Sequence, residues 1–264
     1  MHKDTIGRTL GVAVAVCVAC SIVVSSAAVF LKPLQEANQL RDMKRNILAA
    51  AGFSDEQLNV STEEFDKLYD EMIDTEVVEL ATGEFLTGVE PEDIDDRKEA
   101  KNRELSMAIP DEQDLAKIKR RANRRKIHLY REDGKIKRII LPVYGKGLWS
   151  TMYGYLALAG DGRTIKSLAF YEHGETPGLG GEIDNPRWKA VWIGKTAYDE
   201  KGKPRIEVIK GTVAADSPRA QYQVDGISGA TITGRGVEKL VRFWLDEQGY
   251  GPALDKLRAK EAAQ

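Results

Sequence analysis

The stretch "KIHLYREDGKIKRIILPV", residues 126–143, decides the fold of this 264-residue chain. In it, two runs that alternate between apolar and polar residues flank Asp133 and Gly134. Asp-Gly between such runs is a strong hairpin signal, because both turn residues tolerate positive φ. The stretch therefore predicts two antiparallel strands joined by a tight turn.

The same pattern continues toward the C-terminus. "MYGYLALAG" and "IKSLAFYE" flank Asp161-Gly162, and "RIEVIKGTV" at 205–213 follows Lys201-Gly202 as a further expected strand. A last helix carries its apolar residues on one face: Val237, Leu240, Val241, Trp244 and Leu245. Hairpins with flanking helices predict an α+β domain over residues 126–264 with a mainly antiparallel sheet.

The N-terminal region contains an uncharged apolar run, Leu10 to Leu31, whose 22 residues are long enough to span a bilayer. A cleaved signal peptide ending in the small residues 25–28 is one alternative, and a lipoprotein signal at Cys20 is another. The run stays apolar past both sites, so we expect a single retained transmembrane helix within residues 1–32. Basic residues flank both ends and leave its orientation open.

We expect residues 33–125 to form a helical and irregular segment that packs on the core or links to it. A helical pattern runs from Pro33 to Ala51 and ends at Gly52. Ser61 and Glu64 have the spacing of a capping box and begin a second helix. Residues 74–112 are rich in acids with weak periodicity, and we expect an exposed, partly irregular excursion there.

Charge and composition exclude several classes of function. The 41 acidic and 39 basic residues nearly cancel, which argues against a nucleic-acid partner, and we expect the basic cluster between Lys117 and Lys126 to be a solvated helix face. Both cysteines lie in the N-terminal apolar run and the three histidines lie far apart in sequence. We therefore expect no metal site, no thiol nucleophile and no catalytic side chains in the globular part.

Three glycine-rich loops, 145–150, 173–181 and 225–234, are the candidates for a binding site. Their spacing does not match nucleotide phosphate loops. In the third loop, Gly229 and Ala230 permit close approach to the backbone, and Thr231 supplies a hydroxyl. We expect a helix to start a few residues later, with amides that attract a phosphate. The alternative is that Thr231 or Thr233 serves only as the helix N-cap.

The second loop, "HGETPGLGG", offers the complementary half of a site. Gly178, Gly180 and Gly181 permit tight curvature, so backbone amides can face a planar heterocycle that Leu179 covers. Trp149 of the first loop can add apolar contact. The alternative is a purely structural turn around Pro177. Together the loops predict a site for a phosphorylated aromatic cofactor.

A family resemblance rests on the same residues. "DGISGAT", 225–231, resembles the acceptor motif for covalent flavin attachment, and "HGETPGLG", "GKGLWS" and "MYGYLAL" resemble the matching FMN-binding domain. With the apolar anchor and "LKPLQEANQLRDMKRNIL" at 31–48, nearly the whole chain is similar to the C subunits of sodium-translocating NADH:quinone reductases.

The resemblance implies roles for individual residues. Thr231 is esterified to the phosphate of FMN, and Asp225 serves recognition by the flavin transferase that attaches it, with FAD as donor. The remaining contacts are divided between the phosphate site (Ser228, Gly229 and Ala230) and the isoalloxazine (Thr176, Gly178, Leu179 and Gly180, with Leu148 and Trp149 as neighbours).

The resemblance also implies an electron relay in a bacterial inner-membrane complex built from six different polypeptides. The complex oxidises NADH, reduces ubiquinone and translocates sodium ions through FAD, iron–sulfur, FMN and riboflavin centres. Its subunits A, B, D, E and F are the expected partners, and the soluble domain of this chain is expected to be periplasmic. Alternatives are the G subunit of an Rnf-type complex, a flavin-bearing lipoprotein and a non-redox membrane-anchored binding protein; the long segment before the hairpins favours the quinone reductase.

Overall fold

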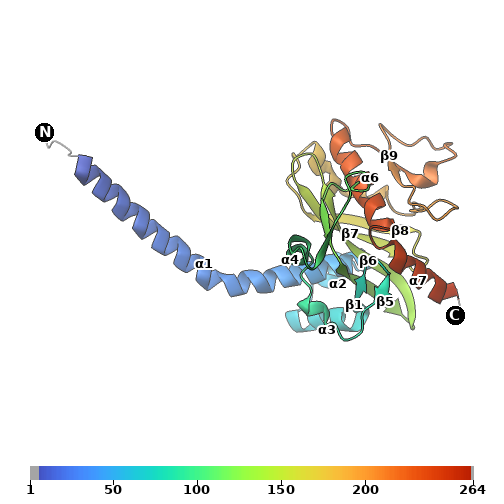
Figure 1. Ribbon diagram of the computed structural model, residues 1–264, viewed down its shortest axis with the longest axis horizontal. Coiled ribbons are helices and arrows are strands. Elements are labelled where there is room, and N and C mark those ends of the chain that lie inside the picture. Colours follow the sequence, from blue (N-terminus) through green and yellow to red (C-terminus); the bar gives the residue numbers. More distant parts are fainter. Residues whose placement is uncertain (1–5, 263–264) are drawn as a thin grey trace. The chain divides into compact units, whose positions relative to one another are not determined.

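The computed structural model describes residues 6–262, which form two compact units, one ending at Arg45 and one starting at Asn46. Helix α1, Ile6–Ala51, passes through Pro33 without a break, so the two expected N-terminal segments are one helix (Figure 1). Its most apolar 18-residue window has a mean hydropathy of 2.6, so by length and composition it can cross a membrane. It ends as expected at Gly52, which has a φ of 108°.

The second unit is built on a six-stranded sheet in the order β2-β1-β5-β6-β7-β8, in which every neighbouring pair is antiparallel. The strands are β1 (Ile73–Glu79), β2 (Glu84–Phe85), β5 (Arg124–Glu132), β6 (Lys135–Lys146), β7 (Thr151–Ala159) and β8 (Ile165–Glu172). The first predicted hairpin is β5–β6, and its turn has positive φ at both Asp133 (52°) and Gly134 (76°). These strands confirm the α+β class with a mainly antiparallel sheet.

Strand β1 corrects the expectation for residues 74–112. It pairs with β5 from Ile73↔Tyr130 to Glu79↔Arg124, and Val77 and Val78 are buried. The expectation of an exposed, irregular segment is therefore wrong for residues 74–79, and the sheet begins well before residue 126. Its three acids and two adjacent valines follow no strict alternation, so the acidic composition hid a half-buried strand.

The basic cluster at 117–126 is also not a solvated helix face. Its residues lie largely in β4 (Arg120–Ala122) and β5, and β4 pairs with β3 (Ser106–Ala108). Arg125 is 2% exposed; its guanidinium lies 3.1 Å from the carboxylate of Asp96 and donates to the hydroxyl of Tyr250 at 3.0 Å. Burial acts to lower the pKa of Arg125, but Asp96, Tyr250 and Tyr144 together outweigh burial and leave the pKa raised. Arg121 and Arg125 are therefore buried in the core, whereas Lys117 and Lys119 remain exposed.

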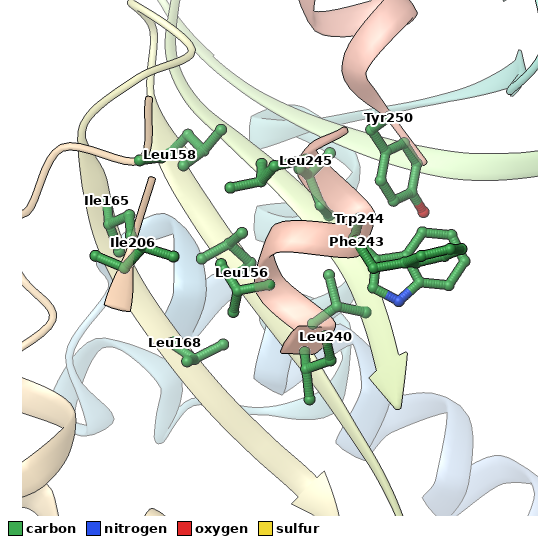
Figure 2. Packing of buried hydrophobic residues seen from close by; sticks show 14 of the residues in the cluster. Leu156, Leu158, Ile165, Leu168, Ile206, Leu240, Phe243, Trp244, Leu245 and Tyr250 are labelled. Carbon is green, nitrogen blue, oxygen red and sulfur yellow. The ribbon is translucent and has the colours of Figure 1, made fainter. Parts of the chain in front are cut away.

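Two C-terminal helices complete the main core. Helix α6, Thr231–Leu245, packs on β6, and α7 spans Gly251–Ala262. Figure 2 shows Phe243 and Trp244 of α6 on the side of Tyr250, and Leu156 of β7 on the other side of the helix. The five apolar residues expected on one face of this helix are all buried, which confirms the predicted stripe.

Shorter elements surround the sheet. They are α2 (Asp55–Leu58), α3 (Thr62–Met72), η1 (Pro91–Asp93), α4 (Asp96–Lys101), η2 (Gly180–Asp184), α5 (Pro186–Ala190) and η3 (Ala220–Tyr222). Helix α3 begins with the predicted capping box of Ser61 and Glu64 and packs on β1 and β5. The expected strand at 205–213 is much shorter: within it, β9 covers Glu207–Val208 and pairs in parallel with β10, Gln223–Val224.

Candidate functional site

The site begins at the first turn of α6. The helix starts at Thr231 rather than a few residues later, and its N-cap is Ala230, with no side chain capping the first turn. The N-cap alternative for Thr231 or Thr233 is therefore wrong. Gly234 and Gly236 obscured the early start, because glycine disfavours helix interiors. Packing requires glycine here: a β-carbon on Gly236 would lie 2.7 Å from the carbonyl oxygen of Lys146.

Thr231 opens onto a cavity of about 1010 Å³. The cavity is lined by residues 207–212, by 226–229, and by one face of α6. Ser228, Gly229 and Thr231 are all on its wall, so the structure brings together three residues of the predicted phosphate site. Thr231 and Ser228 are exposed, whereas Ala230 between them is buried at the start of the helix.

The cavity wall is positively charged. Arg235 and Lys239 follow Thr231 at intervals of four residues along α6, and Lys210 belongs to the segment after β9. Within residues 6–262, none of these three cations has an ion-pair partner in a carboxylate. The two acids of the wall are already engaged: Glu238 accepts from the amide of Val208 at 3.0 Å and pairs with Arg242, and Glu207 pairs with Arg219. Three uncompensated cations beside a helix N-terminus and a free hydroxyl suit a phosphate ester.

The second glycine loop lies against the cavity wall at Gly229. Gly229 has a φ of 72°, and a β-carbon built on it would lie 2.9 Å from Cδ2 of Leu179. The loop itself closes on Thr176, whose carbonyl accepts from the amides of Leu179 at 3.1 Å and Gly181 at 2.9 Å. The residues predicted for the phosphate and those predicted for the ring therefore meet at Gly229 and Leu179.

Glu175 joins all three loops. Its side chain accepts hydrogen bonds from the amides of Leu148 (3.2 Å), Trp149 (3.0 Å) and Ser150 (3.4 Å) in the first loop. It also accepts from the hydroxyl of Thr233 in the third loop at 2.6 Å. Burial acts to raise the pKa of Glu175, but the four donors outweigh burial and hold the pKa below its usual value.

Two of the loop glycines make room for this carboxylate. A β-carbon on Gly147 would lie 2.5 Å from one carboxylate oxygen of Glu175, and one on Gly180 would lie 2.8 Å from the other. Gly180 is buried, with Glu175 and Thr233 as its neighbours. Close contact with Glu175 thus explains why position 180 is a glycine, in addition to the predicted contact with a ring.

Apolar side chains near the loops remain exposed. Trp149 is 66% exposed, Leu179 45%, Leu148 42%, and Ile232, which follows Thr231, 60%. Exposed large apolar residues in one group of loops are typical of a ligand or partner site. Among the described residues, the cavity wall contains neither Leu148 and Trp149 nor residues 176–180, so these side chains lie outside the cavity.

Sequence reasoning missed four functional candidates here. Glu175 was considered only as part of a glycine loop, because nothing in "HGETPGLGG" marks its acid as buried. Lys210, Arg235 and Lys239 carry no motif, although the spacing of Thr231, Arg235 and Lys239 becomes a signal once the helix start is known. In the described part of the chain, no group of three or more metal-ligating side chains is found.

Comparison with known proteins agrees with this site. The family model described as an FMN-binding domain matches residues 147–246, which contain most of the first loop and all of the other two. The chain is 47% identical to the C subunit of the Na(+)-translocating NADH-quinone reductase of Pseudomonas aeruginosa, covering 99% of each chain. It is 45% identical to the C subunit of the same reductase from Yersinia pestis, over 97% of this chain and 95% of that one.

A solved structure shares the fold. The crystal structure of Shewanella oneidensis NqrC has a TM-score of 0.75 and 38% sequence identity, and the match covers 83% of this chain and 98% of that chain. Full-length similarity to proteins that are named as C subunits favours the quinone reductase over the Rnf-type alternative. The chain belongs to the family formed by the C subunits of Na(+)-translocating NADH-quinone reductases.

Proposed function

We propose that this chain is an electron-relay subunit of a membrane complex that oxidises NADH, reduces ubiquinone and translocates sodium ions, and that it carries FMN as a phosphoester of Thr231. One observation carries the proposal. The hydroxyl of Thr231 is exposed at an uncapped helix N-terminus and faces a cavity with three uncompensated cations. The residues present therefore fit a phosphate that is fixed at this position.

Each part of the site has a task in holding the cofactor. FMN, when bound, supplies the one- and two-electron redox chemistry, while the protein contributes position and electrostatics. The first-turn amides of α6 and Arg235 offset the phosphodiester charge, and Ser228 and Ala230 shape its surroundings. Leu179, Leu148 and Trp149 would supply apolar contacts to the isoalloxazine, and Thr176, Gly178 and Gly180 would supply backbone contacts.

Attachment requires a group transfer by a separate enzyme. A flavin transferase with FAD as donor would form the bond from Thr231 Oγ to the FMN phosphorus while the bond to AMP breaks and the hydroxyl proton leaves. Asp225 is the proposed recognition residue. It also has a local structural task, since its carboxylate accepts from the amide of Val213 at 2.8 Å and its carbonyl accepts from the indole of Trp188 at 2.9 Å.

The setting proposed for the chain is the bacterial inner membrane. Helix α1 would be a retained single-pass anchor and the remaining domain would be periplasmic, with subunits A, B, D, E and F as partners and FAD, riboflavin and an iron–sulfur cluster elsewhere in the complex. The apolar length of α1 supports the anchor. N-terminal sequencing of the mature protein should show that residues 10–31 are retained. A start near Ala27, or a lipid on Cys20, would refute the retained anchor.

The attachment is tested by replacing Thr231. Thr231→Ala should leave a folded protein whose denatured gel band has no flavin fluorescence under ultraviolet light. Thr233→Ser is the control, because it keeps the hydroxyl that donates to Glu175. Thr233→Ala would be a poorer control, since the Thr233 side chain is fully buried and its hydroxyl donates to Glu175. A fluorescent Thr231→Ala band would refute attachment at this residue.

A further inference from the structure

The buried carboxylate of Glu175 has no assigned role in flavin binding, yet it is bound to every loop of the site. It is 5% exposed, and its four donors come from two segments that are 25–27 and 58 residues away along the chain. A single side chain therefore fixes the relative positions of loops 145–150, 173–181 and 225–234. Buried charged acceptors form the stronger kind of protein hydrogen bond.

The groups that donate hydrogen bonds to Glu175 come from the loops that surround the proposed cofactor. The amides of Leu148 and Trp149 precede side chains that are 42% and 66% exposed, so these apolar side chains have little packing of their own to hold them. Thr233 is two residues beyond the proposed attachment residue, on the first turn of α6. Glu175 thus connects the backbone under the apolar wall to the helix turn that bears Thr231.

Each of the two carboxylate oxygens of Glu175 accepts two hydrogen bonds. One oxygen accepts from the amides of Trp149 and Ser150, and the other accepts from the amide of Leu148 and the hydroxyl of Thr233. All four partners donate, so both oxygens must accept. A glutamine at this position would point an NH₂ group at one pair of donors and leave that pair unsatisfied.

We propose that Glu175 is a positioning residue for the flavin: it holds the Leu148–Ser150 loop against the first turn of α6, so that the apolar side chains cover the isoalloxazine of an FMN attached at Thr231. The inference rests on the proposed function and deepens it. It assigns no chemical step to Glu175, which acts on the cofactor through the loops that it binds.

The test compares Glu175→Gln with a matched buried carboxylate whose hydrogen bonds come from outside the three loops. Glu99 is also 5% exposed and accepts three hydrogen bonds from Arg124. Both variants are made in the full chain, matured in its host, and examined for loop hydrogen exchange, iodide quenching of flavin fluorescence and flavin midpoint potential. Glu99→Gln serves to measure the general effect of losing a buried carboxylate.

For Glu175→Gln we expect amide exchange at 148–150 to rise on the order of tenfold, because bonds to a charged acceptor are lost. Iodide quenching of the flavin should increase, and the midpoint potential should rise because a buried negative charge is removed from the site. Glu99→Gln should reduce thermal stability and leave all three readouts at wild-type values. Flavin properties that are the same in both variants would show that Glu175 is merely structural.

A second pair of variants keeps the test decisive if Glu175→Gln does not fold. Thr233→Val removes one donor and keeps the carboxylate, whereas Thr233→Ser keeps the hydroxyl. Faster loop exchange and greater quenching in Thr233→Val alone support the proposal, and equal behaviour of the pair contradicts it. Absence of flavin from Thr231 in the wild-type protein would refute the proposed function instead, and loop exchange would still report whether Glu175 fixes the loops.

Discussion

Gly229 and Leu179 are in such close contact that a β-carbon on Gly229 would lie 2.9 Å from the Cδ2 atom of Leu179. Gly229 also has a φ of 72°, a conformation that side-chain-bearing residues rarely adopt. The two residues belong to different loops, 225–234 and 173–181, which the sequence analysis combined into one predicted site for a phosphorylated aromatic cofactor. Their contact is the point where the phosphate half and the ring half of the proposed site meet.

Gly229→Ala should therefore lower the free energy of unfolding by more than its backbone conformation alone requires. Positive φ at a non-glycine residue costs about 1–3 kcal/mol. Gly202 is the matched control, since its φ is 76° and nothing lies within 4 Å of a β-carbon there. We expect urea denaturation to show a larger loss for Gly229→Ala than for Gly202→Ala, together with altered flavin fluorescence in the first variant only. Equal losses and unchanged fluorescence would contradict the contact.

Leu179→Asp tests whether this side chain covers the isoalloxazine. A carboxylate against an apolar ring is unfavourable, so the covalent flavin should be retained with a changed spectrum or midpoint potential. Ile193→Asp is the control, because Ile193 is likewise exposed and lies outside the glycine loops. The prediction fails if spectrum, potential and quinone reduction in Leu179→Asp all match those of the control.

The contribution of Glu175 to stability should depend on pH. Its pKa in the folded protein lies below the ordinary value of 4.5, since its hydrogen bonds to Thr233 and to loop amides outweigh burial. A depressed pKa gives stability that is complete above the unfolded value and is lost as pH falls through the folded value. The difference in unfolding free energy between wild type and Glu175→Gln should be constant near neutral pH and should shrink below pH 4.5. A difference that grows on acidification would contradict the assignment.

The pair Arg125–Asp96 should stabilise the fold without affecting the flavin. Arg125 is 2% exposed, so Asp96→Asn leaves a buried cation without its counter-charge, at a cost of about 3–5 kcal/mol. Glu71→Gln removes a solvent-exposed partner of Lys67 and should cost less than about 1 kcal/mol. Urea titrations of the two variants measure both values, and similar costs would be inconsistent with a buried pair.

Local patterns predicted the hairpins, the capping box at Ser61 and the buried face of α6, because each depends on residues close in sequence. Strand β1 was missed because its acids and valines gave no clear periodicity, and only pairing with β5 makes it a strand. The first turn of α6 was missed because Gly234 and Gly236 disfavour a helix, whereas close packing on Lys146 requires glycine at 236. Hydrogen bonds between distant segments, such as the four that Glu175 accepts, have no local pattern to find.

The cofactor half of the site was predictable only in part. The glycines and Thr231 were visible because small residues and a hydroxyl form a motif. The three cations of the cavity wall come from α6 and from the segment after β9, so their convergence is a property of the fold. Sequence therefore indicated the ligand class better than it indicated what holds the ligand.

The central claim is that Thr231 bears FMN, and peptide mass mapping of the mature protein isolated from its membranes tests it most directly. The peptide that contains residues 225–235 should carry the mass of one FMN phosphoester, and fragmentation should assign it to Thr231. An unmodified peptide in a protein with intact flavin, or FMN assigned to Ser228 or Thr233, would contradict the claim.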